Sequence, residues 1–263
     1  MSVAGTSKSR SSGKPAGRLL WIDCARGGAI LMMALYHLVY DLDTFGGYAL
    51  DSTSGFWARF ADATAGTFLL LVGVSLTLSL ARAGERDGLF GKYLRRGAGI
   101  FGYGMLITLF FGVFGLGAVV FGILHLIGVS IILAYPFLRL GWTNVALGIG
   151  VIAAGVALRA AGVSFGGALP AQVALAPFGI LPESLTMPDY RPLLPGFGVV
   201  LLGIAAGNLL RGRLPKFEPP ATAARGATPL AFLGRHSLFV YLVHQPLIIL
   251  ALAAAGVIRL GLF

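Results

Sequence analysis

The chain has 263 residues, of which 57% are hydrophobic and only 11% charged, and its mean hydropathy is +0.85. Soluble domains are usually about 25% charged, so this composition excludes an ordinary soluble protein. The net charge of +10 is spread among several segments and forms no basic patch with interleaved aromatic residues, which argues against nucleic-acid binding. Cys24 is the only cysteine, which rules out an intrachain disulfide and a Cys-rich metal site, and we expect no bound metal.

The N-terminal residues 1–17 are small, polar and basic, and they predict a disordered cytosolic tail. Residues 18–263 predict a single transmembrane domain, because apolar runs of the roughly 20 residues needed to cross a bilayer recur along them. Lipid-exposed backbone must satisfy its own hydrogen bonds, so the fold class is an all-α, polytopic helix bundle. The predicted spans are 18–40, 61–82, 94–113, 117–138, 142–162, 193–211 and 234–258.

Two further features concern the packing of these spans. The segment between the fifth and sixth spans is rich in Pro and Gly, and it predicts a short interfacial or re-entrant helix. Gly203 and Gly207 form a small-xxx-small pair, which either supports close helix packing in lipid or arises by chance in a Gly-rich chain.

The distribution of cations predicts the orientation of the chain. With the N-terminus inside, most of the 20 Lys and Arg residues fall on cytosolic segments, as the positive-inside rule requires. Arg26 lies within the first span, and the outer segments hold only Arg59, Arg159, Arg191 and Arg259. We therefore expect a cytosolic N-terminus and a C-terminus on the outer side.

The first span carries ionisable groups that a simple membrane helix does not need. Arg26 and His37 are eleven residues apart, which is about three helical turns, so they share one face at a separation of about 16 Å. Asp23 lies one turn before Arg26, and Asp41 one turn after His37. Charges within a span usually face the bundle interior or a polar cavity.

These groups have a functional and a structural interpretation. A guanidinium towards the cytosol suits a phosphate-bearing ligand, and a histidine towards the outside suits proton transfer. Alternatively, Asp23 and Arg26 pair to stabilise the helix start, and His37 reaches for the outer interface.

Other polar groups in the predicted spans carry similar alternatives. His125 is either catalytic or a packed histidine bonded to a nearby carbonyl, and His236 is expected at the interface. His244 forms a polar stripe with Ser237, Tyr241 and Gln245 that lines a cavity or joins helices. Asp62 opens the second span, and Arg59, one turn earlier, is its predicted partner.

Five stretches resemble the heparan-α-glucosaminide N-acetyltransferase catalytic-domain family, formerly DUF1624. They are "RLLWIDCARGGAILMMALYHLVYDL", "ADATAGTFLLLVGVSL", "FGILHLIGVSIILAYPFL", "DYRPLLPGFGVVLLGIAAG" and "FLGRHSLFVYLVHQPL". Asp62, Phe68, Gly73 and Ser75 match the family pattern of the second span, and the Arg26–His37 spacing also resembles the acyltransferase-3 proteins. No P-loop or HExxH motif of soluble enzymes is present.

The resemblance implies a multi-pass acyltransferase of the bacterial inner membrane. It implies that an acetyl or other acyl group passes from cytosolic acyl-CoA, as co-substrate, to a glycan or another amine or hydroxyl acceptor outside. Arg26 and Asp23 then lie near the donor, whose phosphates contact Arg95, Arg96 and Arg235.

On the same reading, His37 is the expected base or acyl carrier and Asp41 orients its ring. His125 is the second choice for the catalytic histidine, and Asp62 and His244 lie on the substrate side. One departure stands out, because lysosomal members place their histidine in the loop before the second span and this loop, "DSTSGFWARFAD", has none. The rival readings are a transporter or flippase with an intramembrane His/Asp path, and a non-catalytic membrane scaffold.

Overall fold

Residues 20–84, 88–113, 119–165, 169–181, 189–211 and 228–258 are described by a computed structural model, and every regular element in them is helical. The predicted tail at 1–17 lies outside these residues. Six of the helices are long and apolar enough to cross a membrane. They are α1 (Leu20–Gly46), α2 (Gly55–Ala83), α3 (Leu89–Val113), α5 (Thr143–Ala160), α7 (Leu193–Arg211) and α10 (Ser237–Ala254). The polytopic helical bundle is therefore confirmed.

The fourth predicted span, 117–138, takes a different form. Its α-helix, α4, covers only Ile123–Leu133, and a 3-10 helix, η1, continues it over Tyr135–Arg139. Pro136 explains the change, because proline has no N–H to donate within an α-helix and its ring crowds the preceding turn. At about 1.5 Å per α-helical and 2 Å per 3-10 residue, the two pieces together extend about 26 Å.

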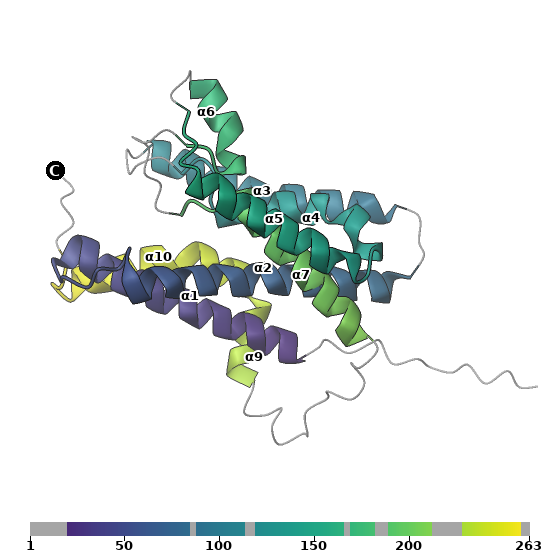
Figure 1. The fold of residues 1–263 in the computed structure, drawn as a ribbon. Helices are drawn as coiled ribbons and strands as arrows, with labels where there is room; N and C mark the ends of the chain where they lie inside the picture. The colour runs from purple at the N-terminus through teal and green to yellow at the C-terminus, as the bar shows by residue number, and fades with distance from the viewer. Residues whose placement is uncertain are drawn as a thin grey trace, which may run out of the picture.

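The remaining elements are short. A helix α6 (Leu169–Leu175) followed by η2 (Ala176–Phe178) occupies the Pro- and Gly-rich segment, as predicted. The last predicted span, 234–258, begins at the end of a separate short helix, α9 (Thr228–Arg235), and continues after His236 as α10. α9 lies across the start of α1, and Gly234 contacts the backbone of Asp23 so closely that a side chain would not fit there (Figure 1).

Glycines fix the crossings between the long helices. α2 and α7 run side by side in the same direction, with Gly203 against Leu70 and Gly73, and Gly207 against Thr77. A Cβ on Gly207 would lie 2.8 Å from the Cβ of Thr77, so the small residues allow backbone contact. The Gly203–Gly207 pair is therefore a real packing motif.

The apolar core lies where α2, α4 and α7 meet, and it contains Leu76, Leu126, Ile131 and Ile204, each about 1% exposed or less. α1 and α10 pack on each other beside this core. The bundle has two ends. At one end, here called the basic end, lie the starts of α1 and α3 and the ends of α2 and α7 (Figure 1). The opposite end holds the end of α1 and the start of α2.

Candidate functional site

Two cavities lie along the bundle interior. The larger, of about 470 Å³, lies between α1, α2, α3, α4 and the α9–α10 segment, and is here called the central cavity. Its polar lining consists of Arg26, Tyr36, His37, Thr64, Ser75, Arg96, Asp189, Arg191, Arg235, Ser237 and Tyr241. A volume of this size falls within the usual range for ligand pockets.

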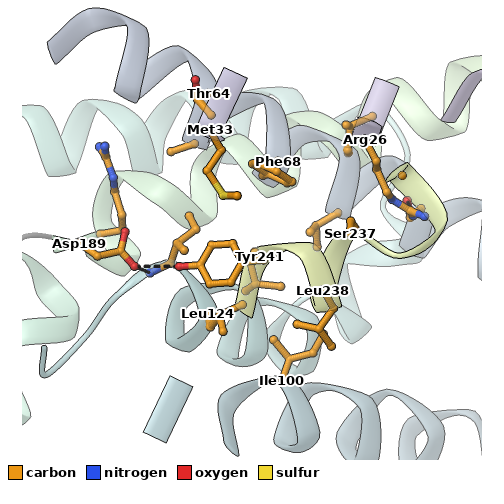
Figure 2. A pocket seen from close by; sticks show the side chains of 18 of the residues that line it. Arg26, Met33, Thr64, Phe68, Ile100, Leu124, Asp189, Ser237, Leu238 and Tyr241 are labelled. Atoms are coloured by element: carbon orange, nitrogen blue, oxygen red, sulfur yellow. Dashed lines mark hydrogen bonds between the residues drawn. The ribbon is translucent and has the colours of Figure 1, made fainter. Parts of the chain in front are cut away.

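The second cavity, of about 440 Å³, lies at the basic end and is here called the basic cavity. Its charged lining is Asp23, Arg26, Arg82, Lys92 and Arg96. Arg26, Ser75 and Arg96 line both cavities, so the two adjoin at these side chains. In Figure 2, Arg26 and Asp189 lie at opposite ends of the central cavity, with Phe68 and Tyr241 between them.

Two cations of the basic cavity make polar contacts with neighbouring side chains. Arg26 donates to the Ser75 hydroxyl and lies 3.6 Å from the Asp23 carboxylate, which confirms the predicted Asp23–Arg26 pair. Lys92 donates to the Ser79 hydroxyl at 3.4 Å. Because one carboxylate faces four cations, the cavity has a strong positive potential and suits a ligand with several phosphates.

The other cations predicted to hold phosphates separate into two groups. Arg96 lines both cavities and Arg235 lines the central one, where its Nε donates to the Ala231 carbonyl at 3.2 Å. Arg95, next to Arg96 on α3, is exposed and lines neither cavity. The helical rotation of about 100° between neighbours turns Arg95 away from the site.

His37 reaches the central cavity from α1, so Arg26 and His37 line one cavity as their spacing predicts. Its ring contacts that of His244 on α10, with ring centroids 4.8 Å apart and planes at 64°. The Nδ1 atom of His37 is buried and has no hydrogen-bond partner among the described residues.

The predicted role of Asp41 needs correction. Its carboxylate is fully buried and accepts a hydrogen bond from Gln245 Nε2 at 2.7 Å, while no bond joins it to His37 in the described structure. One further turn of α1 directs Asp41 into the α10 interface and away from the cavity. Asp41 therefore joins α1 to α10 and does not orient the His37 ring directly.

The opposite end of the central cavity holds residues that sequence reasoning missed. Asp189 Oδ2 accepts hydrogen bonds from the Tyr241 hydroxyl and from the Ile123 backbone N–H, both at 3.1 Å. Burial raises the pKa of the Asp189 carboxyl, and the Ile123 N–H, the nearby Arg191 and the Tyr241 hydroxyl partly oppose this effect. In the sequence, Asp189 and Arg191 could have been noticed as the two charges of "DYR", which stand directly before an apolar run.

Asp62 also lies at this end, but its partner is not the predicted one. It forms an ion pair with Arg191, and Arg59 is not its partner in the described structure. Arg191 is 129 residues away in the chain, so local helical spacing gave the wrong cation. The side chain of Asp62 is 66% exposed, which places the pair at the mouth of the cavity.

His125 has a structural role at the start of α4. Its Nδ1 accepts from the Gly122 N–H at 3.1 Å, and its Nε2 lies 3.4 Å from the Thr108 hydroxyl. Phe101 and Phe121 cover the ring, which is 1% exposed and does not line the central cavity. Both nitrogens are engaged, so the packed interpretation fits the geometry better than the catalytic one.

No group of three or more His, Cys, Asp or Glu side chains that could hold a metal ion occurs within the described ranges.

Comparisons with known proteins supply the remaining evidence. A family model described as "Heparan-alpha-glucosaminide N-acetyltransferase, catalytic" matches residues 18–246. Neither a curated protein nor a solved structure matches the chain.

Proposed function

The chain belongs to the heparan-alpha-glucosaminide N-acetyltransferase catalytic family, and we propose that it transfers an acetyl group from acetyl-CoA to a glycan-type acceptor across a membrane. The family implies an acetyltransferase-type enzyme, and the six apolar helices make the chain a multi-pass membrane protein. We further propose that acetyl-CoA is the donor, that the acceptor is of the glycan type, and that the protein lies in the bacterial inner membrane.

The donor enters from the basic end, which we assign to the cytosol on the positive-inside rule. The phosphates of acetyl-CoA bind among Arg26, Arg82, Lys92 and Arg96, whose charges offset the anionic donor. The pantetheine arm then extends past Arg26 and Ser75 into the central cavity, where the lining becomes mainly apolar. Its length is similar to the roughly 16 Å rise along α1 between Arg26 and His37, so the thioester arrives beside His37.

The acceptor enters from the opposite end, where Asp62, Asp189 and Arg191 offer both signs of charge to a polar sugar. Its hydroxyl or amine attacks the thioester carbonyl while His37 takes the proton, and the C–S bond breaks as the C–O or C–N bond forms. The protonated His37 then gives the proton to the departing CoA thiolate. The reaction therefore consumes and releases no net proton.

The observation that carries this proposal is the junction of the two cavities at Arg26, Ser75 and Arg96. It supports a continuous route from a cationic, phosphate-binding compartment to a histidine near the other end of the bundle. A scaffold protein requires no such route.

The test measures transfer of labelled acetyl from acetyl-CoA to amine and hydroxyl sugar acceptors by the purified protein in lipid nanodiscs. His37→Ala is expected to lower kcat by about 100-fold or more, because general acid–base catalysis contributes that much. His236→Ala is the matched control, since His236 is an exposed histidine that lines neither cavity. Undiminished transfer by His37→Ala would contradict the assignment of His37, and no transfer by wild type would contradict the proposed function.

A further inference from the structure

The interface between α1 and α10 contains a histidine pair that the proposed reaction leaves unexplained. His244 is 8% exposed and buried against His37, yet within the described part of the chain its Nε2 has no hydrogen-bond partner. The Nδ1 of His37 is likewise buried without a partner. A buried polar atom without a partner costs about 1–3 kcal/mol, so two of them on rings in contact call for an explanation.

The backbone of α10 determines which nitrogen of His244 carries its proton. The Nδ1 of His244 lies 2.6 Å from the Tyr241 carbonyl oxygen, which only accepts hydrogen bonds. Nδ1 therefore donates, and in the neutral ring Nε2 is left with a free lone pair. His244 thus presents an acceptor, and no donor, at its unpartnered nitrogen.

The separation of the rings fits a hydrogen bond between them. Two imidazoles joined by an N–H···N bond of about 2.9 Å have ring centres on the order of 5 Å apart, and the centroids here are 4.8 Å apart. The ring separation therefore falls in the range that such a bond requires.

We propose that His244 is a positioning residue for His37, whose Nδ1–H it accepts at its own Nε2. This bond holds His37 in the tautomer with a basic Nε2, which is the nitrogen left to take the proton of the acceptor. The Tyr241 carbonyl orients His244, and His244 in turn orients His37. Asp41, the carboxylate expected to orient His37, acts only indirectly, through its hydrogen bond with Gln245.

The contact next to His244 keeps the two rings in register. Gln245, the following residue, donates to Asp41 at 2.7 Å and so fixes the rotation of α10 against α1. Asp41 and His37 are one turn apart on α1, and their partners are adjacent on α10. The Asp41–Gln245 bond therefore aligns His244 with His37.

The effect of the His37–His244 bond on catalysis rests on the proposed function, whereas the existence of the bond does not. The test therefore includes a measurement that does not depend on activity. The chain has 4 histidines, and ring-¹⁵N NMR of ¹⁵N-histidine protein in nanodiscs resolves the tautomer of each. Signals of His37 and His244 are assigned from the single variants His37→Gln and His244→Gln. We expect the wild type to carry the His37 proton on Nδ1.

The variant His244→Phe keeps the ring shape and removes the acceptor. We expect that the His37 proton is then no longer held on Nδ1. We also expect kcat to fall by about 10–100-fold, as is usual when a group that orients a functional side chain is lost, while the KM for acetyl-CoA stays unchanged. His244→Gln is expected to recover part of kcat, because its amide oxygen accepts the same proton. His244→Leu serves if the Phe variant does not fold, and His236→Phe is the control.

Two results would overturn the inference: a wild-type His37 with its proton on Nε2, or a His37 tautomer unchanged in both apolar variants. A merely structural His244 would lower thermal stability while leaving that tautomer as it was. If the wild type transfers no acetyl group, the proposed function fails, and the NMR result still decides whether the histidine contact exists.

Discussion

Two adjacent arginines on α3 allow a controlled test of the basic cavity as the donor site. Both side chains are exposed, but Arg96 lines both cavities and Arg95 lines neither. Arg96→Ala removes a cation from the proposed phosphate contacts, and Arg95→Ala removes the same charge from the same helix at a position that turns away. The two variants have equal net charge, so any difference between them reports the site.

The expected magnitude follows from the composition of the cavity. A hydrogen bond between charged groups contributes about 1.5–3 kcal/mol. Three cations remain after the substitution, and solvent reaches the Arg96 side chain, so the lower part of that range applies. A loss of about 1.5–2 kcal/mol corresponds to a roughly 10–30-fold weaker affinity for acetyl-CoA. Arg96 is assigned to the phosphates of the donor and not to the reacting atoms, so kcat is expected to stay unchanged.

The assay measures initial rates against acetyl-CoA concentration for wild type and both variants, together with direct donor binding by calorimetry. Arg95→Ala is expected to stay within about twofold of wild type, as surface substitutions usually do. The difference between Arg96→Ala and wild type is also expected to shrink at high salt, because screening weakens phosphate contacts. Equal effects of the two variants, or a kcat effect without a KM effect, would refute the assignment of the phosphate site.

Two further predictions concern stability. Gly73→Ala would place a Cβ 2.7 Å from the backbone nitrogen of Ile204, so it should destabilise the protein by about 1–3 kcal/mol. A lower melting temperature in detergent checks this, and Gly28→Ala, which meets nothing within 4 Å, should show no loss. Burial raises the pKa of Asp189, so the folded chain holds that proton more tightly than the unfolded chain, and stability falls as the pH rises from the ordinary aspartate value through the raised pKa. Asp189→Asn should therefore melt higher than wild type at pH 7.5, with a difference that shrinks as the pH falls towards the ordinary aspartate value of about 4. A constant or reversed difference would contradict this reasoning.

Apolar patterning predicted most of the fold. The span 193–211 coincides with α7, because Pro192 and Arg211 bound a run that is apolar except for Asn208. The fourth span was less well predicted, since hydropathy is insensitive to the change from α-helix to 3-10 helix at Pro136. The break at His236 also escaped notice, because it depends on the contact of α9 with α1.

The candidate site was predicted only where it depends on one helix. Arg26 and His37 share a cavity because helical periodicity fixes their relative direction. The pairing of Asp62 with Arg191 depends instead on how distant segments pack, and single-sequence spacing carries no information about that. Arg95 shows a related limit, since charge alone did not distinguish it from Arg96.

Adjoining cavities inside a membrane protein also raise the question of ion leakage. Arg26, Arg82, Lys92 and Arg96 place fixed positive charge around one mouth of the route. Such charge raises the energy of any small cation that enters, as basic residues do in water channels that exclude protons. Protons and Na⁺ therefore meet a barrier where an anionic ligand meets attraction. The same side chains that would bind phosphates thus also protect the membrane potential while the site is empty.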